Sequence, residues 1–242
     1  TIKVTNKAKD AKVIIDGMEL VEAASQSELN DIIAAGNDVT VALAAGNYLL
    51  PSVSNGNVAI TGGKDVVITI NKPNLSGSDI TLEGVTVNGS GYATGIQHVN
   101  TVTYNNVKVV GEMCLYGEAA TFTNCEFVLN NQYIWTYGCK NTTFEKCTFN
   151  TNGKAILVYN EGAGACNVVV KNCTFNATAG AKAGAIANQN CAAIEIDNFQ
   201  SSNVGAAHNV TASDNKFDNK FSGEWRIKNF VAGNAITVNG VA

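Results

Sequence analysis

The sequence is poor in charge, in proline and in arginine. Only 15% of its 242 residues are charged, there are 2 prolines, and Arg226 is the one arginine. Binding to phosphate backbones needs clustered Lys and Arg, which a net charge of −4 does not suggest. The composition therefore argues against a nucleic-acid partner. It also argues against highly anionic polysaccharides, which guanidinium groups usually hold.

Long apolar runs and metal-binding motifs are missing as well. No hydrophobic stretch approaches the length that crosses a bilayer, so no membrane span is expected. There are 2 histidines and no Cys-x-x-Cys pair among the 7 cysteines, which makes zinc a poor interpretation, and we expect no cofactor. No signal peptide is visible, and a start at Thr1 rather than Met fits a processed or trimmed chain.

What the sequence does contain is an internal repeat. Its eight-residue units have apolar residues at the first, third, sixth and eighth positions, and such alternation indicates strands with one buried face. The fifth position is mostly Gly or Asn, which tolerate a left-handed backbone, so we expect a corner there. The units span residues 80–87, 102–109, 120–127, 142–149, 168–175 and 194–201. Their fifth residues are Gly84, Asn106, Asn124, Lys146, Asn172 and Asn198.

Like residues fall above one another when these units are aligned. A parallel coil produces such columns, with rungs about 4.8 Å apart. We interpret the cysteines as a buried ladder of thiols that pack as small hydrophobic groups. The first inward column runs Val85, Val107, Cys125, Cys147, Cys173 and Phe199, and the second runs Val87, Val109, Phe127, Phe149 and Phe175.

A second repeat lies between the units of the first. It spans residues 96–100, 113–117, 134–138, 156–160 and 186–190, with the first and third positions facing inward. His98 falls at one of these inward positions and is expected to be a core residue. Two ladders of strands and a short third side predict a three-sided solenoid.

A capping helix is expected at residues 25–36, because a solenoid exposes its first and last rungs. Ser27 is the expected N-cap, and Leu29, Ile32 and Ile33 form the apolar face. Residues 1–24 are then an N-terminal strand or hairpin segment, and residues 37–200 the parallel β-helix. Residues 201–242 fit the repeat poorly and are expected to form an irregular last coil and a C-terminal cap.

Three features together resemble a known superfamily. They are the cap helix, the string AAGNYLL at residues 44–50 and the NCTF corner at 172–175. Over residues 25–200 the chain resembles the right-handed parallel β-helix, or pectate-lyase-like, superfamily. The resemblance implies an all-β fold: a right-handed three-sided parallel β-helix with an N-terminal capping α-helix. It does not imply one function, since the fold hosts lyases, hydrolases, epimerases, phage tailspikes and non-catalytic adhesins.

The catalytic patterns of that superfamily are not evident. Its lyases bind calcium through several converging carboxylates, whereas the outward positions here hold isolated ones, such as Glu83, Glu145 and Asp197. Its hydrolases need paired carboxylates, and no Asp-Asp pair exists. Arg226-Ile-Lys228 matches one hydrolase string outside the clear repeat, which we interpret as coincidence, and His208 is expected in a polar loop. No catalytic or metal-binding residue is predicted.

The outward positions of the second repeat carry the candidate site. They place tyrosines on successive rungs beside a tryptophan, and an exposed aromatic stripe of this kind binds sugars or protein partners. Alternatively, loops at 160–167 and 176–183 cover this face, or the rings serve stability alone. The candidate ligand-binding residues are Gln97, Tyr116, Trp135, Tyr137, Leu157, Tyr159 and Gln189.

The sequence leaves three functions open. The first is a non-catalytic bacterial protein of the cell surface or extracellular space, adhesin-like, which binds polysaccharide, cell-surface glycan or a protein partner. The second is a phage fibre or decoration protein of the virion, expected as a homotrimer, for which unpaired buried thiols suit assembly in a reducing cytoplasm. The third is a polysaccharide lyase or glycoside hydrolase with an atypical site.

Overall fold

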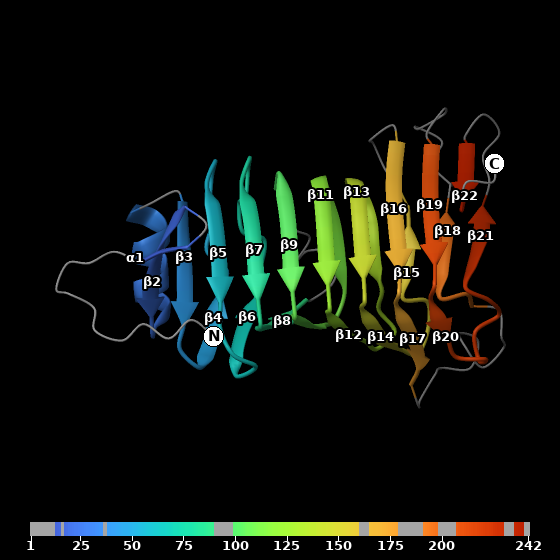
Figure 1. Cartoon of the computed structure of the whole chain (residues 1–242), viewed down its shortest axis with the longest axis horizontal. Helices are drawn as coiled ribbons and strands as arrows, with labels where there is room; N and C mark the ends of the chain where they lie inside the picture. Colours follow the sequence, from blue (N-terminus) through green and yellow to red (C-terminus); the bar gives the residue numbers. More distant parts are fainter. Residues whose placement is uncertain are drawn as a thin grey trace.

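The computed structural model describes residues 13–15, 17–35, 38–89, 99–159, 165–178, 191–197, 207–229 and 235–239. These residues form a stack of parallel strands with one short helix at the N-terminal end (Figure 1). Among the strands of these described ranges, only β1 (Val13–Ile15) pairs antiparallel, with β2 (Met18–Ala23). The predicted parallel solenoid is confirmed.

The strands lie on three faces, here called face 1, face 2 and face 3. Face 1 runs from β2 through β3 (Asp38–Leu43), β5 (Asn57–Thr61), β7 (Asp79–Glu83), β9 (Thr101–Asn105), the second halves of β11 (Met113–Thr123) and β13 (Ile134–Glu145), β16 (Ala165–Lys171) and β19 (Ala207–Ser213) to β22 (Ala235–Val238). Face 2 consists of β4 (Gly46–Leu49), β6 (Val66–Thr69), β8 (Thr86–Asn88), β10 (Lys108–Val110), β12 (Glu126–Leu129), β14 (Thr148–Thr151), β17 (Thr174–Ala177) and β20 (Lys216–Phe217). Face 3 consists of the first halves of β11 and β13, followed by β15 (Ile156–Val158), β18 (Ile194–Asp197) and β21 (Trp225–Asn229).

The corner between faces 1 and 2 has a left-handed backbone, as the repeat predicts. The φ angle at this position lies between 52° and 71° in five rungs, at Gly84, Asn106, Asn124, Lys146 and Asn172. Gly84 also lies close to the rung before, because a Cβ there would come within 2.7 Å of the Gly62 carbonyl oxygen. Asn198, the sixth expected corner, lies outside the described residues.

The inward columns are confirmed for the residues that the structure describes, and Phe199, at the end of the first column, lies outside them. All seven cysteines are buried, and the thiols of Cys125, Cys147 and Cys173 donate to backbone carbonyls in the core. The rings of Phe127, Phe149 and Phe175 stack at centroid distances of 4.6 and 4.7 Å. Stacked rings add about 0.5–1.5 kcal/mol per pair beyond the area they bury, so this column favours in-register coils.

The register expected for residues 194–201 is wrong. Ile194–Asp197 forms β18 and pairs with β15 on face 3, not with the strands of face 1. The rung that follows β16 on face 1 is β19, where Val210 pairs with Val168 and the next corner is Asp214, with φ 57°. Alternation of period two looks the same on every face, so the pattern of residues 194–197 fits either one. Regular rungs therefore continue beyond residue 200.

The N-terminal helix α1 spans Gln26–Ala35 and buries Leu29 and Ile33. Its N-cap is Ser25 rather than the predicted Ser27. The Ser25 hydroxyl accepts a hydrogen bond from the Glu28 amide at 3.2 Å, and the Glu28 carboxylate accepts one from the Ala24 amide at 2.7 Å. This arrangement is similar to a capping box and satisfies the Glu28 amide in the first turn and the Ala24 amide just before the N-cap.

Candidate functional site

Face 3 carries all of the predicted site residues that the structure describes. Tyr116 lies on β11, Trp135 and Tyr137 lie on β13, Leu157 lies on β15, and Tyr159 follows β15. Their side chains point outward, because the residues between them, such as Ile134 and Ile156, are buried in the core. Gln97 and Gln189, and also His98, lie outside the described residues.

The stripe is less exposed than the sequence suggests. Tyr116, Trp135, Tyr137 and Tyr159 are partly buried, and Leu157 is only 7% exposed. Leu157 lies between the outward side chains of Trp135 on one neighbouring strand and Glu195 on the other, and both are longer than it is. We conclude that Leu157 supports the face rather than offering contact area.

The register of the tyrosines also differs from the expected column. The pairing of β11 with β13 shifts between Cys114 and Tyr116, which places Tyr116 opposite Gly138 rather than Tyr137. A Cβ at Gly138 would come within 2.8 Å of Cδ1 of Tyr116, so the glycine leaves room for that ring. The ring of Tyr116 still contacts that of Tyr137, with centroids 5.3 Å apart.

Five aromatic side chains pack together on this face, and we call them the ring cluster. Trp135 is at its centre, with its ring 5.0 Å from that of Tyr137, 5.5 Å from Tyr159 and 6.0 Å from Tyr133. Tyr137 and Tyr159 lie 5.8 Å apart. Contacts at these distances stabilise the rings in fixed orientations. The members are Tyr116, Tyr133, Trp135, Tyr137 and Tyr159.

A group of three charged residues adjoins the ring cluster, and we call it the ion triad. The Lys154 ammonium lies 4.5 Å from the centroid of the Tyr133 ring, a cation–π contact. It also donates to Oε1 of Glu195 at 2.8 Å. Arg226 donates to Oε2 of Glu195 through Nε at 3.1 Å and Nη2 at 2.6 Å. The triad therefore joins the turn before β15 to β18 and β21.

Sequence reasoning missed the ion triad. Glu195 was aligned with the wrong face, and Arg226 was attributed to chance. The strand register brings Glu195 and Arg226 together, because Leu157, Glu195 and Arg226 are paired in one outward column. The one signal in the sequence was that Arg226 is the single arginine. Its partner Glu195 is set by the pairing of β18 with β21, and no constant spacing in the sequence points to it.

The electrostatics of this region follow from burial and charge. Burial alone would raise the pKa of Glu195, but the hydrogen bonds and charges of Lys154 and Arg226 outweigh it and hold that pKa below its usual value. Burial raises the pKa of Glu112, and the nearby Lys154 opposes this. Burial also raises the pKa of Tyr133, with the charges of Glu112 and Glu195 adding to the effect.

Other chemical groups do not converge on this face. Among the described residues, no three His, Cys, Asp or Glu side chains gather in a way that could hold a metal ion. His208, which the sequence placed in a polar loop, is buried on β19 opposite Cys166. Within the described ranges, no helix is long and apolar enough to cross a membrane.

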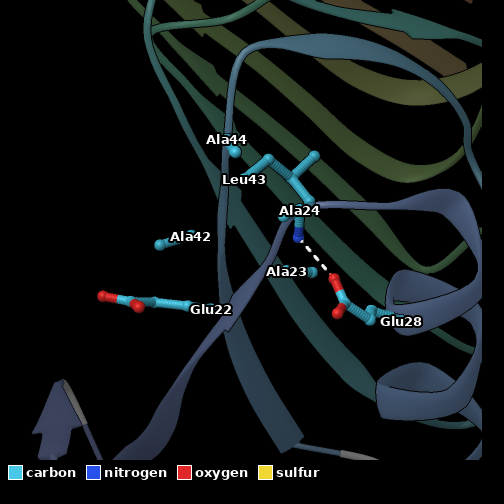
Figure 2. A pocket seen from close by; sticks show the side chains of 7 residues that line it. All are labelled: Glu22, Ala23, Ala24, Glu28, Ala42, Leu43 and Ala44. Carbon is cyan, nitrogen blue, oxygen red and sulfur yellow. Dashed lines mark hydrogen bonds between the residues drawn. The ribbon is translucent and has the colours of Figure 1, made fainter.

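A cavity of about 360 Å³ lies between β2, β3 and the start of α1, at the N-terminal end of the stack. Figure 2 shows the Glu28 carboxylate turned back to the Ala24 amide, while Glu22 points away from it. The remaining lining is mostly alanine. Since Glu28 serves the helix cap, the cavity offers little that would orient a ligand.

The parallel pairing on three faces defines the molecule as an all-β solenoid with an N-terminal cap helix. A family model described as a right-handed β-helix region matches residues 74–238. The chain belongs to this right-handed β-helix family, and the match extends from the turn before β7 to the end of β22. A comparison with curated proteins finds no match.

Proposed function

We propose that the protein is a non-catalytic, adhesin-like β-helix that binds glycans through the ring cluster on face 3. The observation that carries this proposal is the packing of five aromatic rings on one outward surface, with centroids 5.0–6.0 Å apart. The apolar faces of sugars pack on aromatic rings, and Tyr residues also offer hydroxyl groups to sugar hydroxyls, whereas the indole nitrogen of Trp135 is buried. An extracellular or cell-surface location accompanies this function.

The cluster is suited to binding because its rings are held before a ligand arrives. Tyr116, Trp135 and Tyr137 lie on strands of one sheet, and Tyr133 and Tyr159 lie next to strand ends. Each ring contacts at least one other. Binding therefore costs little side-chain entropy, which favours affinity from a modest contact area. The ion triad and Glu112 supply hydrogen-bonding groups at one end of the rings, as sugar hydroxyls require.

A glycan array with the wild-type protein tests the proposal, followed by titration of any bound glycan. Trp135→Ala and Tyr137→Ala are each expected to weaken binding by roughly tenfold or more, because each removes a central ring. Phe217→Ala is the matched control, since this exposed aromatic residue lies on face 2. Equal affinity of all three variants and the wild type would contradict the proposal, provided that thermal unfolding shows them folded.

Two further measurements separate the alternative functions. Light scattering is expected to show a monomer, whereas a stable trimer would favour a virion component. Incubation with the bound glycan is expected to release no shorter products. Newly formed reducing ends or unsaturated sugars would instead indicate a hydrolase or a lyase.

A further inference from the structure

The ion triad presents positive charge to solvent. The carboxylate of Glu195 is 2% exposed, whereas the side chains of Lys154 and Arg226 are 20% and 37% exposed. The two cations therefore reach solvent, while the anion that they share lies beneath them. Glu112 is a further acid near Lys154, whose charge acts on it, and it is itself partly buried.

We propose that the glycan bound on face 3 carries sulfate esters, one of which is bound by Lys154 and Arg226 beside the ring cluster. This inference rests on the proposed glycan-binding function and adds the class of glycan. A sulfate group remains anionic at every physiological pH and accepts hydrogen bonds on several sides. It would bind at the exposed parts of the two cations, of which Lys154 lies over the Tyr133 ring.

The arrangement of the two cations favours sulfate over carboxylate. The Nε and Nη2 groups of Arg226 both donate to Glu195, so one of the two planar edges with which a guanidinium binds a carboxylate is already occupied. Lys154 approaches the opposite oxygen of Glu195 and acts as a point charge without a preferred plane. Cations that approach from two directions suit a tetrahedral anion better than a flat one.

The two cations of the ion triad contrast with the negative net charge of the whole chain. The net charge is −4, so the molecule as a whole repels polyanions, and attraction must arise from a local group. The sequence argued against anionic glycans because it has one arginine. The structure places that arginine in the same group as Lys154, next to the ring cluster.

Three polymers with one backbone test the inference: dextran, carboxymethyl dextran and dextran sulfate. Wild-type protein is expected to bind dextran sulfate about tenfold more tightly than carboxymethyl dextran at low ionic strength, and to bind neutral dextran weakly. Arg226→Gln and Lys154→Gln are each expected to lose about tenfold in affinity for dextran sulfate. Arg226→Lys, which keeps the charge and protects the fold, is expected to lose less.

Lys140→Gln is the matched control, because Lys140 forms an exposed ion pair with Glu118 away from the triad. It is expected to bind dextran sulfate as the wild type does. Equal binding of the sulfated and carboxylated polymers overturns the choice of sulfate. Unchanged affinity in folded Arg226→Gln and Lys154→Gln, or no binding of dextran sulfate by the wild type, overturns the site.

The sulfate inference and the proposed glycan-binding function can fail separately, because different variants test them. Trp135→Ala is expected to weaken binding of neutral and sulfated glycans alike, whereas Arg226→Gln affects only the sulfated ones. If binding of a sulfated glycan needs Trp135 but is unchanged in Arg226→Gln, the sulfate inference is wrong and the proposed function still stands.

Discussion

At the scale of single residues, Tyr104 places a polar hydroxyl in an apolar part of the core. Tyr104 is fully buried in the column of Phe122, and its hydroxyl has no hydrogen-bond partner among the described residues. Burial raises the pKa of Tyr104 far above its usual value. An unsatisfied buried hydroxyl costs about 1–3 kcal/mol. We therefore expect Tyr104→Phe to raise the free energy of unfolding by about 1 kcal/mol.

Chemical denaturation of both proteins measures this difference. The reverse change one rung further on, Phe122→Tyr, is the control, because it adds a hydroxyl to the same column. It is expected to destabilise the protein. A Tyr104→Phe variant that is less stable than the wild type would show that the hydroxyl is satisfied.

At the scale of elements, the start of the cap helix offers a clear test. Ser25→Ala removes the hydroxyl that accepts from the Glu28 amide and is expected to cost about 1 kcal/mol. Ser27→Ala, at the position that the sequence suggested, changes an exposed residue inside α1 and is expected to cost almost nothing. Thermal unfolding of the two variants compares them. The reverse order of stabilities would restore Ser27 as the cap.

The elements also show which parts of the fold can be predicted from the sequence and which cannot. Corners such as Asn124 and Lys146 were predictable. Most repeat units have Gly or Asn, which tolerate a left-handed backbone, at this one position, and the strands on both sides of it repeat. The cap was misplaced by two residues, since Ser25 and Ser27 are both good N-caps and only the bond to Glu28 separates them. The face of Ile194–Asp197 was not predictable from alternation, because every face has the same period.

At the scale of the whole molecule, the rings and the ion triad differ in how the sequence encodes them. Trp135 and Tyr137 are neighbours on one strand, so a local pattern finds them. Lys154 and Arg226 are 41 and 31 residues from Glu195, and the coils between them differ in length. Only the register of face 3 brings them together. Partial covering of the stripe was also not predictable, because it depends on which side chains neighbour Leu157.

The ion triad links three rungs of the solenoid, and in a repeat protein stability is largely a sum over such neighbouring interfaces. Because the pKa of Glu195 is lowered in the folded state, its contribution is fully present above the unfolded value of about 4.3. That contribution is lost as the pH falls through the lower, folded-state value. Glu195→Gln is therefore expected to cost about 2–3 kcal/mol at pH 7, and progressively less in acid.

Denaturation of the wild type and Glu195→Gln at pH 7, 5, 4 and 3 measures this effect. The difference between the two proteins isolates Glu195 from the other carboxylates, which titrate in both. We expect a constant gap at pH 7 and 5 that narrows below about pH 4.3, because the protonated wild-type side chain then resembles the amide. Glu118→Gln, which breaks only an exposed pair with Lys140, is expected to show a gap of less than about 1 kcal/mol throughout. A gap for Glu195→Gln that does not depend on pH would mean that the triad acts through packing rather than charge, and that its cations are not held by an ionised carboxylate.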